Sequence, residues 1–269
     1  MIRVSIITIN RNNESGLGAT IESVFGQTFT GFEYIIIDGA STDRSVEVIK
    51  KYADRINYWI SEPDNGIYNA MNKGIRQATG EYLLFLNSGD ILHDPSVLQV
   101  LSGPDTFEDI IYGDIMYEGS EAPLIMPDKI TLNTFLGPSI GHNASFIKAE
   151  LFKKHGLYNE KNKIVSDWEF FIDALLKSGC SYRHVNKIFT IYQKGGISVS
   201  PGHNSLLMEE RDAYLKKAFP LFYDLIRENF ALRNELAVYE HSNIIKLVRK
   251  LQNSRLNKAK NKYFRFKKK

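Results

Sequence analysis

The chain has 269 residues, of which 43% are hydrophobic and 24% charged, so it can build a core and is not an intrinsically disordered protein. Its single cysteine, Cys180, excludes an internal disulfide framework and fits a reducing compartment. The formal net charge is +3, and no apolar stretch has the length and lack of charge needed to span a membrane.

The first half of the sequence alternates buried strands with helices. Strands are predicted by near-continuous apolar runs at 4–9, 34–38, 58–60 and 82–86. Apolar residues at helical spacing fill the segments between these runs. Buried strands that alternate with helices are typical of a mostly parallel sheet covered on both faces. We therefore expect an α/β fold.

The second half is less regular. Strands are predicted at 110–114, 144–147 and 182–192. A helix is predicted over 168–176, and from Ser205 the pattern is largely helical with an interruption at Pro220. We expect a folded domain over residues 1–200 and a helical C-terminal extension over residues 201–269.

The end of the chain is basic. Eleven Lys and Arg residues and no acidic residue follow Glu240, which leaves 23 basic and 31 acidic residues, a net charge of −8, for the rest of the chain. Aliphatic and aromatic side chains lie among the lysines of residues 241–269. This pattern favours a cytoplasmic protein that is peripheral on the anionic inner face of the plasma membrane. A partly disordered, solvated end is the alternative, and nucleic acid is the least favoured partner.

Polar residues follow each of the first four predicted strands. They are Asn10, Asp38, residues 62–65 and Asp90. Ligands of parallel α/β sheets bind at the carboxyl ends of the strands. We therefore expect these clusters, which are distant in the sequence, to line one crevice.

Asp90 and Asp38 are the first two candidates for chemistry. Asp90 ends the segment 85–90 after a buried strand, where a carboxylate can bind a divalent cation that takes its other oxygens from water and phosphates. A turn-capping role is an equal alternative for Asp90. Asp38 can accept a hydrogen bond from the imide N–H of uracil, or cap the turn that follows it.

The stretch from Glu62 to Gly74 is the most distinctive. Pro63 and Gly66 predict a turn, and a helix is predicted to begin near Ile67. Polar side chains at the start of a helix beside a sheet edge suit an anionic or sugar ligand. The donor-binding candidates here and in the loop before Asp90 are Glu62, Asp64, Asn69, Lys73 and Ser88.

Asp167 opens a predicted amphipathic helix. A carboxylate at the mouth of a crevice can act as the general base that takes a proton from an acceptor hydroxyl. Asp is also a preferred N-cap, so the spacing alone does not choose between the two roles. Glu169 is the alternative base. His142, before an apolar strand, is a candidate for contact with phosphate or acceptor, although a lone histidine is more often a hydrogen-bonded structural residue.

A glycine-rich segment, 194–204, contains Gly196 and His203. It fits a mobile loop that closes over substrate, and it fits a plain connection equally well. Walker, GxGxxG and zinc-site spacings are absent from the sequence.

Several of these motifs together resemble the family 2 glycosyltransferases. The resemblance is carried by residues 4–10, 36–43, 62–74 and 80–90, in this order and at matching intervals. It extends over roughly residues 2–200. Members of this family that build bacterial cell-surface polysaccharides often use lipid-linked acceptors.

The resemblance implies a GT-A-type, Rossmann-like fold with a nucleotide-binding half at about 1–92 and an acceptor half at about 93–200. It also implies an inverting transferase, of the hexosyltransferase type, that uses a nucleoside-diphosphate sugar. UDP is the expected nucleotide, and Mn²⁺ or Mg²⁺ is the usual cofactor. The implied acceptor is a hydroxyl of a glycan or of a lipid-linked glycan.

The resemblance also implies roles for single residues. Thr8 and Asp38 correspond to residues around the nucleotide base, and Asp90 to the metal-binding carboxylate. Asp167 corresponds to the catalytic base. The residues implied to line the donor pocket are Glu62 and Asp64.

The sequence departs from the family pattern at two places. Asn87 and Gly89 stand where many members have Asp, so we expect weak metal binding until the donor diphosphate adds its oxygens. Asp167 lacks the adjacent acidic residue of the family pair, which leaves Glu169 open as the base. The missing carboxylates favour, as an alternative, a non-catalytic nucleotide-sugar-binding or scaffold protein. A nucleotidyltransferase is a less favoured reading.

Overall fold

The computed structural model describes residues 2–103, 106–137, 139–193 and 204–241. The chain divides into two compact units, Met1–Ala213 and Tyr214–Lys269. The first unit holds the sheet and every candidate site residue that the structure describes. The second unit holds the end of α7 (Asn204–Ala218) and the whole of α8 (Tyr223–His241).

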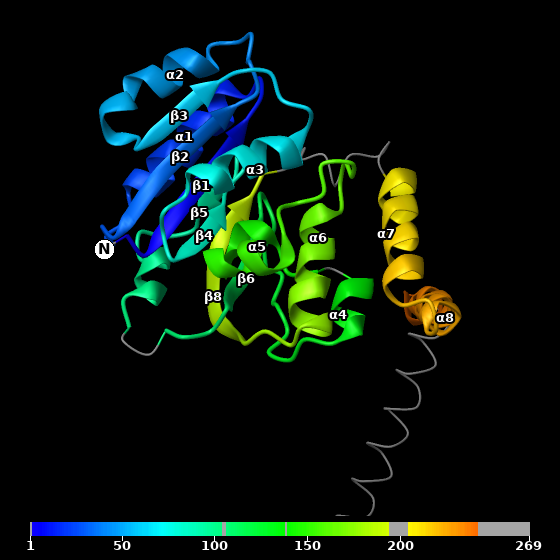
Figure 1. Ribbon diagram of the computed structural model, residues 1–269. Helices are drawn as coiled ribbons and strands as arrows, with labels where there is room; N and C mark the ends of the chain where they lie inside the picture. The colour runs from blue at the N-terminus through cyan, green and yellow to red at the C-terminus, as the bar shows by residue number, and fades with distance from the viewer. Residues whose placement is uncertain (1, 104–105, 138, 194–203, 242–269) are drawn as a thin grey trace, which may run out of the picture. The chain divides into compact units, whose positions relative to one another are not determined.

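Within the described residues, eight strands form one sheet in the order β3-β2-β1-β4-β7-β6-β8-β5 (Figure 1). The strands are β1 (Val4–Asn10), β2 (Phe32–Asp38), β3 (Tyr58–Ser61), β4 (Tyr82–Phe85), β5 (Ile91–Leu92), β6 (Ile110–Tyr117), β7 (Ser145–Lys148) and β8 (Tyr182–Tyr192). β1 to β4 are mutually parallel, as the buried apolar runs predict. β7 is antiparallel to β4 and β6, β8 is parallel to β6, and β5 is antiparallel to β8.

The register of the parallel strands aligns their polar ends. Asn10 at the end of β1 lies opposite Asp38 of β2, and Asp38 lies opposite Ser61 of β3. On the other side of β1, the N–H of Ser88 donates to the carbonyl of Ile9 over 3.0 Å. The backbone pairing therefore brings the ends of these strands together, as the sequence predicts.

Helices lie on both sides of the sheet (Figure 1). The α-helices of the first unit before α7 are α1 (Glu14–Phe25), α2 (Ser45–Lys51), α3 (Ile67–Gln77), α4 (Leu132–Leu136), α5 (Ala149–His155) and α6 (Ser166–Phe171). Short 3-10 helices are η1 (Ala53–Arg55), η2 (Val97–Leu101) and η3 (His142–Ala144), and a π-helical turn, η4 (Ile172–Lys177), continues α6.

Local sequence explains two of the helix starts. Asn13 caps α1 because its Oδ1 accepts from the N–H of Gly16 over 3.2 Å. α3 begins after Gly66, whose φ of 116° lies in the region that favours glycine. The sequence turn at Pro63 and Gly66 therefore ends where it was predicted to end, and α3 then packs on β1 and β2.

The core lies between the sheet and these helices. Ile6, Tyr34 and Phe85 from three adjacent strands are completely buried. Thr8 is also completely buried, and its Oγ1 lies 3.0 Å from the hydroxyl of Tyr34. Burial raises the pKa of Tyr34, and the hydrogen bond with Thr8 opposes that rise only in part.

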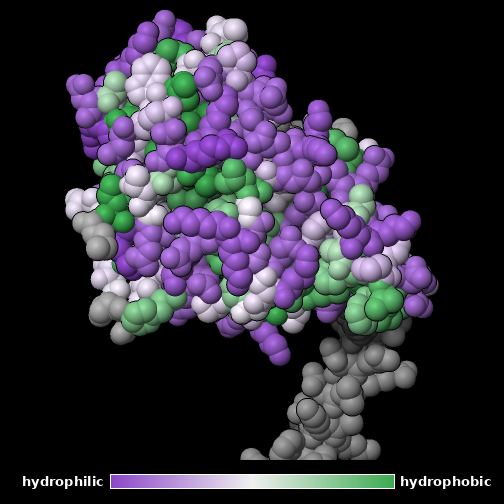
Figure 2. Space-filling model, in the orientation of Figure 1, coloured by the Kyte–Doolittle hydropathy of each residue, from purple (hydrophilic) through white to green (hydrophobic). Residues whose placement is uncertain are grey.

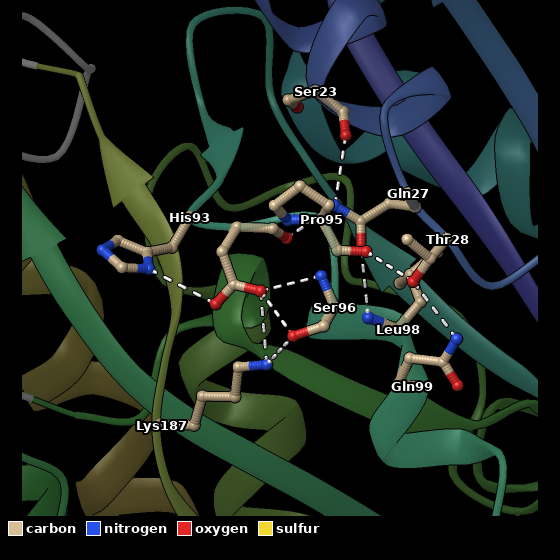
Figure 3. A network of polar contacts seen from close by, with 10 residues as sticks. Ser23, Gln27, Thr28, His93, Pro95, Ser96, Leu98, Gln99 and Lys187 are labelled. Carbon is tan, nitrogen blue, oxygen red and sulfur yellow. Dashed lines mark hydrogen bonds and ion pairs between the residues drawn. The ribbon is translucent and has the colours of Figure 1, made fainter.

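The segment that follows Asp90 is held by a polar network (Figure 3). Gln27, after α1, donates from Nε2 to the carbonyl of Asp94 over 2.8 Å and accepts the N–H of Leu98 over 3.2 Å. The Asp94 carboxylate lies 3.3 Å from Nζ of Lys187 on β8 and accepts the N–H of Ser96 over 2.7 Å. Burial alone would raise the pKa of Asp94, but Ser96 and Lys187 lower it to about 2. The network therefore joins α1, η2 and β8.

The face seen in Figure 2 is mostly hydrophilic, with hydrophobic residues in small groups. In the second unit, α8 exposes several large apolar side chains, namely Leu225, Leu232, Leu236 and Tyr239. Within the described part of the chain, no helix combines the length and apolar character that crossing a membrane requires.

Candidate active site

Asp38 organises the end of the β1–β2 pair. Its Oδ1 accepts from Nδ2 of Asn10 over 2.7 Å and from Oγ of Ser41 over 2.5 Å. Its Oδ2 accepts from the N–H of Ser41 over 2.9 Å and from Oγ of Ser61 over 2.6 Å. The carboxylate is completely buried, and these four hydrogen bonds come from groups of the protein. Asp38 thereby fixes the loop that leads to α2.

The polar stretch before and along α3 contains two ion pairs. Nζ of Lys73 lies 2.7 Å from Glu62 and donates to the carbonyl of Pro63 over 2.9 Å. Asp64 accepts the N–H of Gly66 over 3.0 Å, and Nη1 of Arg11 lies 4.0 Å from its Oδ1. Two acidic residues of the turn after β3, Glu62 and Asp64, are therefore each paired with a basic residue, Lys73 and Arg11 respectively.

Asn69 faces the second half of the domain. Its Nδ2 donates to Glu160 over 2.8 Å, and its Oδ1 accepts the N–H of Asn65 over 3.3 Å. Asn72, one position before Lys73, donates to the other oxygen of Glu160 over 2.8 Å. These hydrogen bonds, the one from Asn72 foremost, lower the pKa of Glu160. α3 is thus tied to the loop that precedes α6.

The turn after β4 carries Asp90. Asp90 is 3% exposed, and its Oδ2 accepts the N–H of Asn87 over 3.3 Å. Burial raises its pKa to about 6, against the charge of His142, which lowers it. Gly89 has a φ of 105°, a left-handed conformation that lets the turn close on Asp90. Oδ1 of Asn87 is buried and has no hydrogen-bond partner among the described residues.

Ser88 joins this turn to α1. Nδ2 of Asn13 donates to its carbonyl over 2.9 Å and lies 3.4 Å from its hydroxyl. Because Asn13 is also the cap of α1, the start of that helix and the turn after β4 share one side chain. Together with the pairing of Ser88 and Ile9, this places the turn next to Asn10 and Asp38.

Asp167 lies in the first turn of α6, and both of its oxygens are held. Oδ1 accepts from the hydroxyl of Tyr68 on α3 over 2.8 Å, and Oδ2 lies 2.7 Å from Nδ1 of His142. The N-cap of α6 is Val165, so the capping role that the sequence allowed for Asp167 is not the one that its side chain fills. Nε2 of His142 lies 3.3 Å from Nδ2 of Asn87, which extends the contacts to the turn that carries Asp90.

Electrostatics keep Asp167 ionised. Burial alone would raise its pKa, but the hydrogen bond and charge of His142 and the hydrogen bond of Tyr68 lower it below its ordinary value. In turn, burial would lower the pKa of His142, and Asp167 and Asp90 raise it. The two carboxylates therefore favour the charged form of His142, and His142 favours the charged form of Asp167.

Glu169 has different surroundings. Burial raises its pKa, and the charged groups that act on it are Asp173 and Glu210. On an α-helix, residues two positions apart point in different directions. The contacts with His142 and Tyr68 therefore favour Asp167 over Glu169 as the base.

The structure brings most of the predicted residues to one edge of the sheet. Hydrogen bonds and strand pairing connect Asp38, Asn10, the turn at Ser88 to Asp90, and Asp167 through His142. Thr8 instead lies in the interior against Tyr34. Two candidates, Gly196 and His203, lie outside the described residues.

Two residues of the site were missed at the level of the sequence. Tyr68 is 2% exposed and lies among the apolar residues of α3, so its pattern is that of a core aromatic. Arg211 lies on α7 with its guanidinium over the ring of Trp168, 5.1 Å from the ring centroid. Only the fold brings Tyr68 to Asp167 and Arg211 to the neighbouring Trp168, so no local signal could have identified them.

Known proteins are similar to this chain in sequence. Residues 5–168 match Glycosyl transferase family 2. A PGL/p-HBAD biosynthesis glycosyltransferase of Mycobacterium bovis is 28% identical over 204 residues, which cover 72% of this chain and 78% of that protein. An uncharacterized glycosyltransferase of Mycobacterium tuberculosis is 36% identical over 181 residues, covering 64% of this chain and 69% of that protein.

Solved structures agree with the fold. S. aureus TarS in complex with UDP-GlcNAc has a TM-score of 0.67 at 21% identity, over 85% of this chain and 71% of that chain. The mannosyltransferase PcManGT from Pyrobaculum calidifontis, in complex with GDP-Man and Mn²⁺, has a TM-score of 0.60 at 14% identity, over 94% of this chain and 79% of that chain.

The mixed sheet and its flanking helices are those of the GT-A fold, which defines the class of the protein. The chain belongs to glycosyl transferase family 2 and is a glycosyltransferase.

Proposed function

We propose that this enzyme transfers a sugar, with inversion at the anomeric carbon, from a nucleoside-diphosphate sugar to a hydroxyl of a glycan or lipid-linked acceptor. The observation that carries the proposal is the ionised Asp167, held by Tyr68 and His142 and connected through Asn87 to the turn of Asp90. The complex of TarS with UDP-GlcNAc supports UDP as the nucleotide.

In the proposed reaction, Asp167 accepts the proton of the acceptor hydroxyl as its oxygen attacks the anomeric carbon. The bond between that carbon and the diphosphate oxygen breaks, and the diphosphate leaves with the electron pair. Tyr68 and His142 hold the two carboxylate oxygens, which leaves the remaining lone pairs for the acceptor proton. A single displacement of this kind inverts the configuration.

The turn after β4 fits a divalent cation that arrives with the donor. Among the described residues, no three His, Cys, Asp or Glu side chains form a complete metal site. The turn nevertheless offers one buried carboxylate, Asp90, and one unpartnered amide oxygen, Oδ1 of Asn87. Mg²⁺ and similar ions bind with one or two protein oxygens, waters and substrate phosphates. Asp90 and Asn87 would hold Mn²⁺ or Mg²⁺, and the ion would neutralise charge on the leaving diphosphate.

We also propose a peripheral membrane location, which a lipid-linked acceptor requires. The eleven basic residues after Glu240 suit an anionic surface, and exposed leucines on α8 add apolar area close to them in the sequence. Flotation with anionic and neutral liposomes tests this location. Full-length protein should float only with anionic liposomes, and equal flotation of a chain truncated after residue 240 would reject the basic end as the anchor.

A donor panel tests the proposed reaction. The melting temperature is measured with UDP, GDP and dTDP sugars, each with and without Mn²⁺, because ligands that bind the native state raise it. We expect a UDP sugar to give the largest shift and Mn²⁺ to increase it. The anomeric configuration of the product, read by NMR from a transfer or hydrolysis reaction, tests inversion. Retention of configuration, or an absence of shift with every nucleotide sugar, would contradict the proposal.

A further inference from the structure

Arg211 is placed near the candidate base by its contact with Trp168. Its guanidinium lies over Trp168, the residue after Asp167, with Cζ 5.1 Å from the ring centroid. The indole N–H of Trp168 donates to the carbonyl of Phe135 over 3.0 Å, so the ring itself is held in place. The cation–π contact therefore holds the guanidinium next to a ring that is itself held in place.

The neighbour of Arg211 anchors the same helix. Glu210 accepts the N–H of Lys163 over 2.7 Å and the N–H of Ile164 over 3.0 Å. These two residues lead into α6, which starts at Ser166 and carries Asp167. Glu210 therefore sets α7 against the start of α6, and the next residue, Arg211, lies close enough to Asp167 for the two charges to interact.

Arg211 forms no ion pair with a carboxylate of the described residues. Ion pairs within the described residues engage five other arginines, Arg3, Arg11, Arg44, Arg76 and Arg183. Arg211 is in none of the pairs found there, and its Nε is buried without a hydrogen-bond partner. Burial lowers its pKa, and the charges of Asp167 and Tyr68 oppose this shift. Both oxygens of Asp167 are already engaged by Tyr68 and His142.

The stacking on Trp168 offsets only part of the desolvation of this cation. A cation–π contact contributes on the order of 0.5 to 2 kcal/mol. Taking a charged group out of water costs several kcal/mol, which hydrogen bonds to an anion normally offset. Since no carboxylate of the described residues forms an ion pair with Arg211, and both oxygens of Asp167 are engaged elsewhere, a substrate is the natural source of that anion.

We propose that Arg211 binds a phosphate group of a substrate next to Asp167. The planar guanidinium can donate two parallel N–H bonds to phosphate oxygens, which a lysine cannot do. The phosphate belongs either to the diphosphate of the donor or to a lipid phosphate of the acceptor, both of which must approach the reacting carbon near Asp167. This inference rests on the proposed function, which places those groups there.

The test compares three full-length variants with the wild type. Arg211→Met keeps an unbranched apolar stem over Trp168, Arg211→Lys keeps a charge without the fork, and Arg233→Gln removes an exposed arginine of α8 as a control. Binding of inorganic pyrophosphate is measured by calorimetry. We expect Arg211→Met to bind roughly 10- to 100-fold more weakly, Arg211→Lys to be intermediate, and Arg233→Gln to match the wild type. Equal affinity of wild type and Arg211→Met would overturn the proposal.

Two further ligands identify the source of the phosphate. If affinity for UDP falls in Arg211→Met, the partner is the donor diphosphate. If affinity for the soluble lipid phosphate farnesyl phosphate falls and that for UDP does not, the partner is the acceptor. Loss of neither would overturn the proposal. Asp167→Asn keeps the arginine, so retained transfer in that variant would refute the proposed base while the pyrophosphate result still stands.

Discussion

Oδ2 of Asp167 and Nδ1 of His142 lie 2.7 Å apart, and this contact between residues 25 positions apart in the sequence joins α6 to the 3-10 turn η3. The pair couples two ionisable groups, because burial opposes charge on both and each partner restores the charge of the other. An ionised carboxylate is what a general base requires at neutral pH. The same contact explains why Asp167 is placed at the site and not used as a helix cap.

Asp167→Asn should abolish most of the turnover and leave donor binding intact. An amide cannot accept the acceptor proton, and a positioned general base contributes roughly 10²- to 10⁴-fold to the rate. The measurement is kcat for transfer together with the affinity for UDP. Glu169→Gln is the matched control, which should change kcat by less than about tenfold. A larger loss in Glu169→Gln than in Asp167→Asn would reverse the assignment.

His142→Gln should destabilise the protein in a pH-dependent way. The pKa of His142 is raised in the folded state, since Asp167 and Asp90 outweigh burial. Its contribution to the free energy of unfolding is therefore fully present below the unfolded-state pKa, about 6.5, and is lost as the pH rises through the folded pKa. Urea unfolding at pH 6 and pH 9 should show a difference between wild type and variant that is larger at pH 6.

His155→Gln serves as the control with the opposite sign. Burial and the nearby Lys154 lower the pKa of His155, so its neutral form is favoured in the folded state. Its contribution to stability is present above the unfolded-state pKa and falls as the pH drops below it. If the two histidine variants showed the same pH trend, the coupling of His142 to Asp167 would be wrong.

Asp90→Asn should stabilise the protein at alkaline pH. Burial raises the pKa of Asp90 to about 6, so its stabilising contribution is present below the unfolded-state pKa and is lost as the pH rises through about 6. A pKa shift of about two units corresponds to roughly 3 kcal/mol. We expect Asp90→Asn to have a free energy of unfolding higher than that of the wild type by up to this amount at pH 8, and to show no such gain at pH 4. Urea unfolding measures the difference, with the exposed Asp54→Asn as the control. Lower stability of Asp90→Asn at pH 8 would contradict the expected sign.

Gly74→Ala should destabilise the domain, and Gly18→Ala should not. A methyl group on Gly74 would overlap Cγ2 of Ile7, where α3 packs on β1, and overpacking typically costs about 1 to 3 kcal/mol. The nearest atom to a methyl group on Gly18 is 4.0 Å away, so this helical glycine can gain up to about 1 kcal/mol as alanine. Thermal unfolding of both variants measures the contrast. Equal stability of the two would show that α3 can move away from β1.

The parallel half of the sheet was predictable because its strands are short, apolar and separated by helices. The polar residues at the ends of these strands, Asp38 and Asp90 among them, could be assigned to one edge by topology alone. β5 was missed because two residues, Ile91 and Leu92, carry no periodic signal, and only β8 makes them a strand. The predicted helix over 168–176 contains a change to π-helical geometry at Ile172 that the apolar spacing does not reveal.

The sequence could not predict which distant residues contact the site residues in the folded protein. The hydroxyl of Tyr68 meets Asp167 across 99 residues of chain, and Asn72 meets Glu160 across 88. A tyrosine within an apolar helical pattern is predicted to be a core residue. Tyr68 is buried in the core, and its hydroxyl also donates to Asp167. The family resemblance could point to Asp167, whereas the groups that hold its two oxygens follow only from the packing of α3 against η3 and α6.

The pairing of β5 with β8 has a mechanical consequence for the turn that carries Asp90. β5 begins at the next residue, and Ile91 and Leu92 are matched to Ile191 and Thr190 of a strand that also pairs with β6 along most of its length. The backbone next to Asp90 is therefore held by a long strand that is itself paired within the sheet. We therefore expect the turn that carries Asp90 to keep its position when a ligand binds.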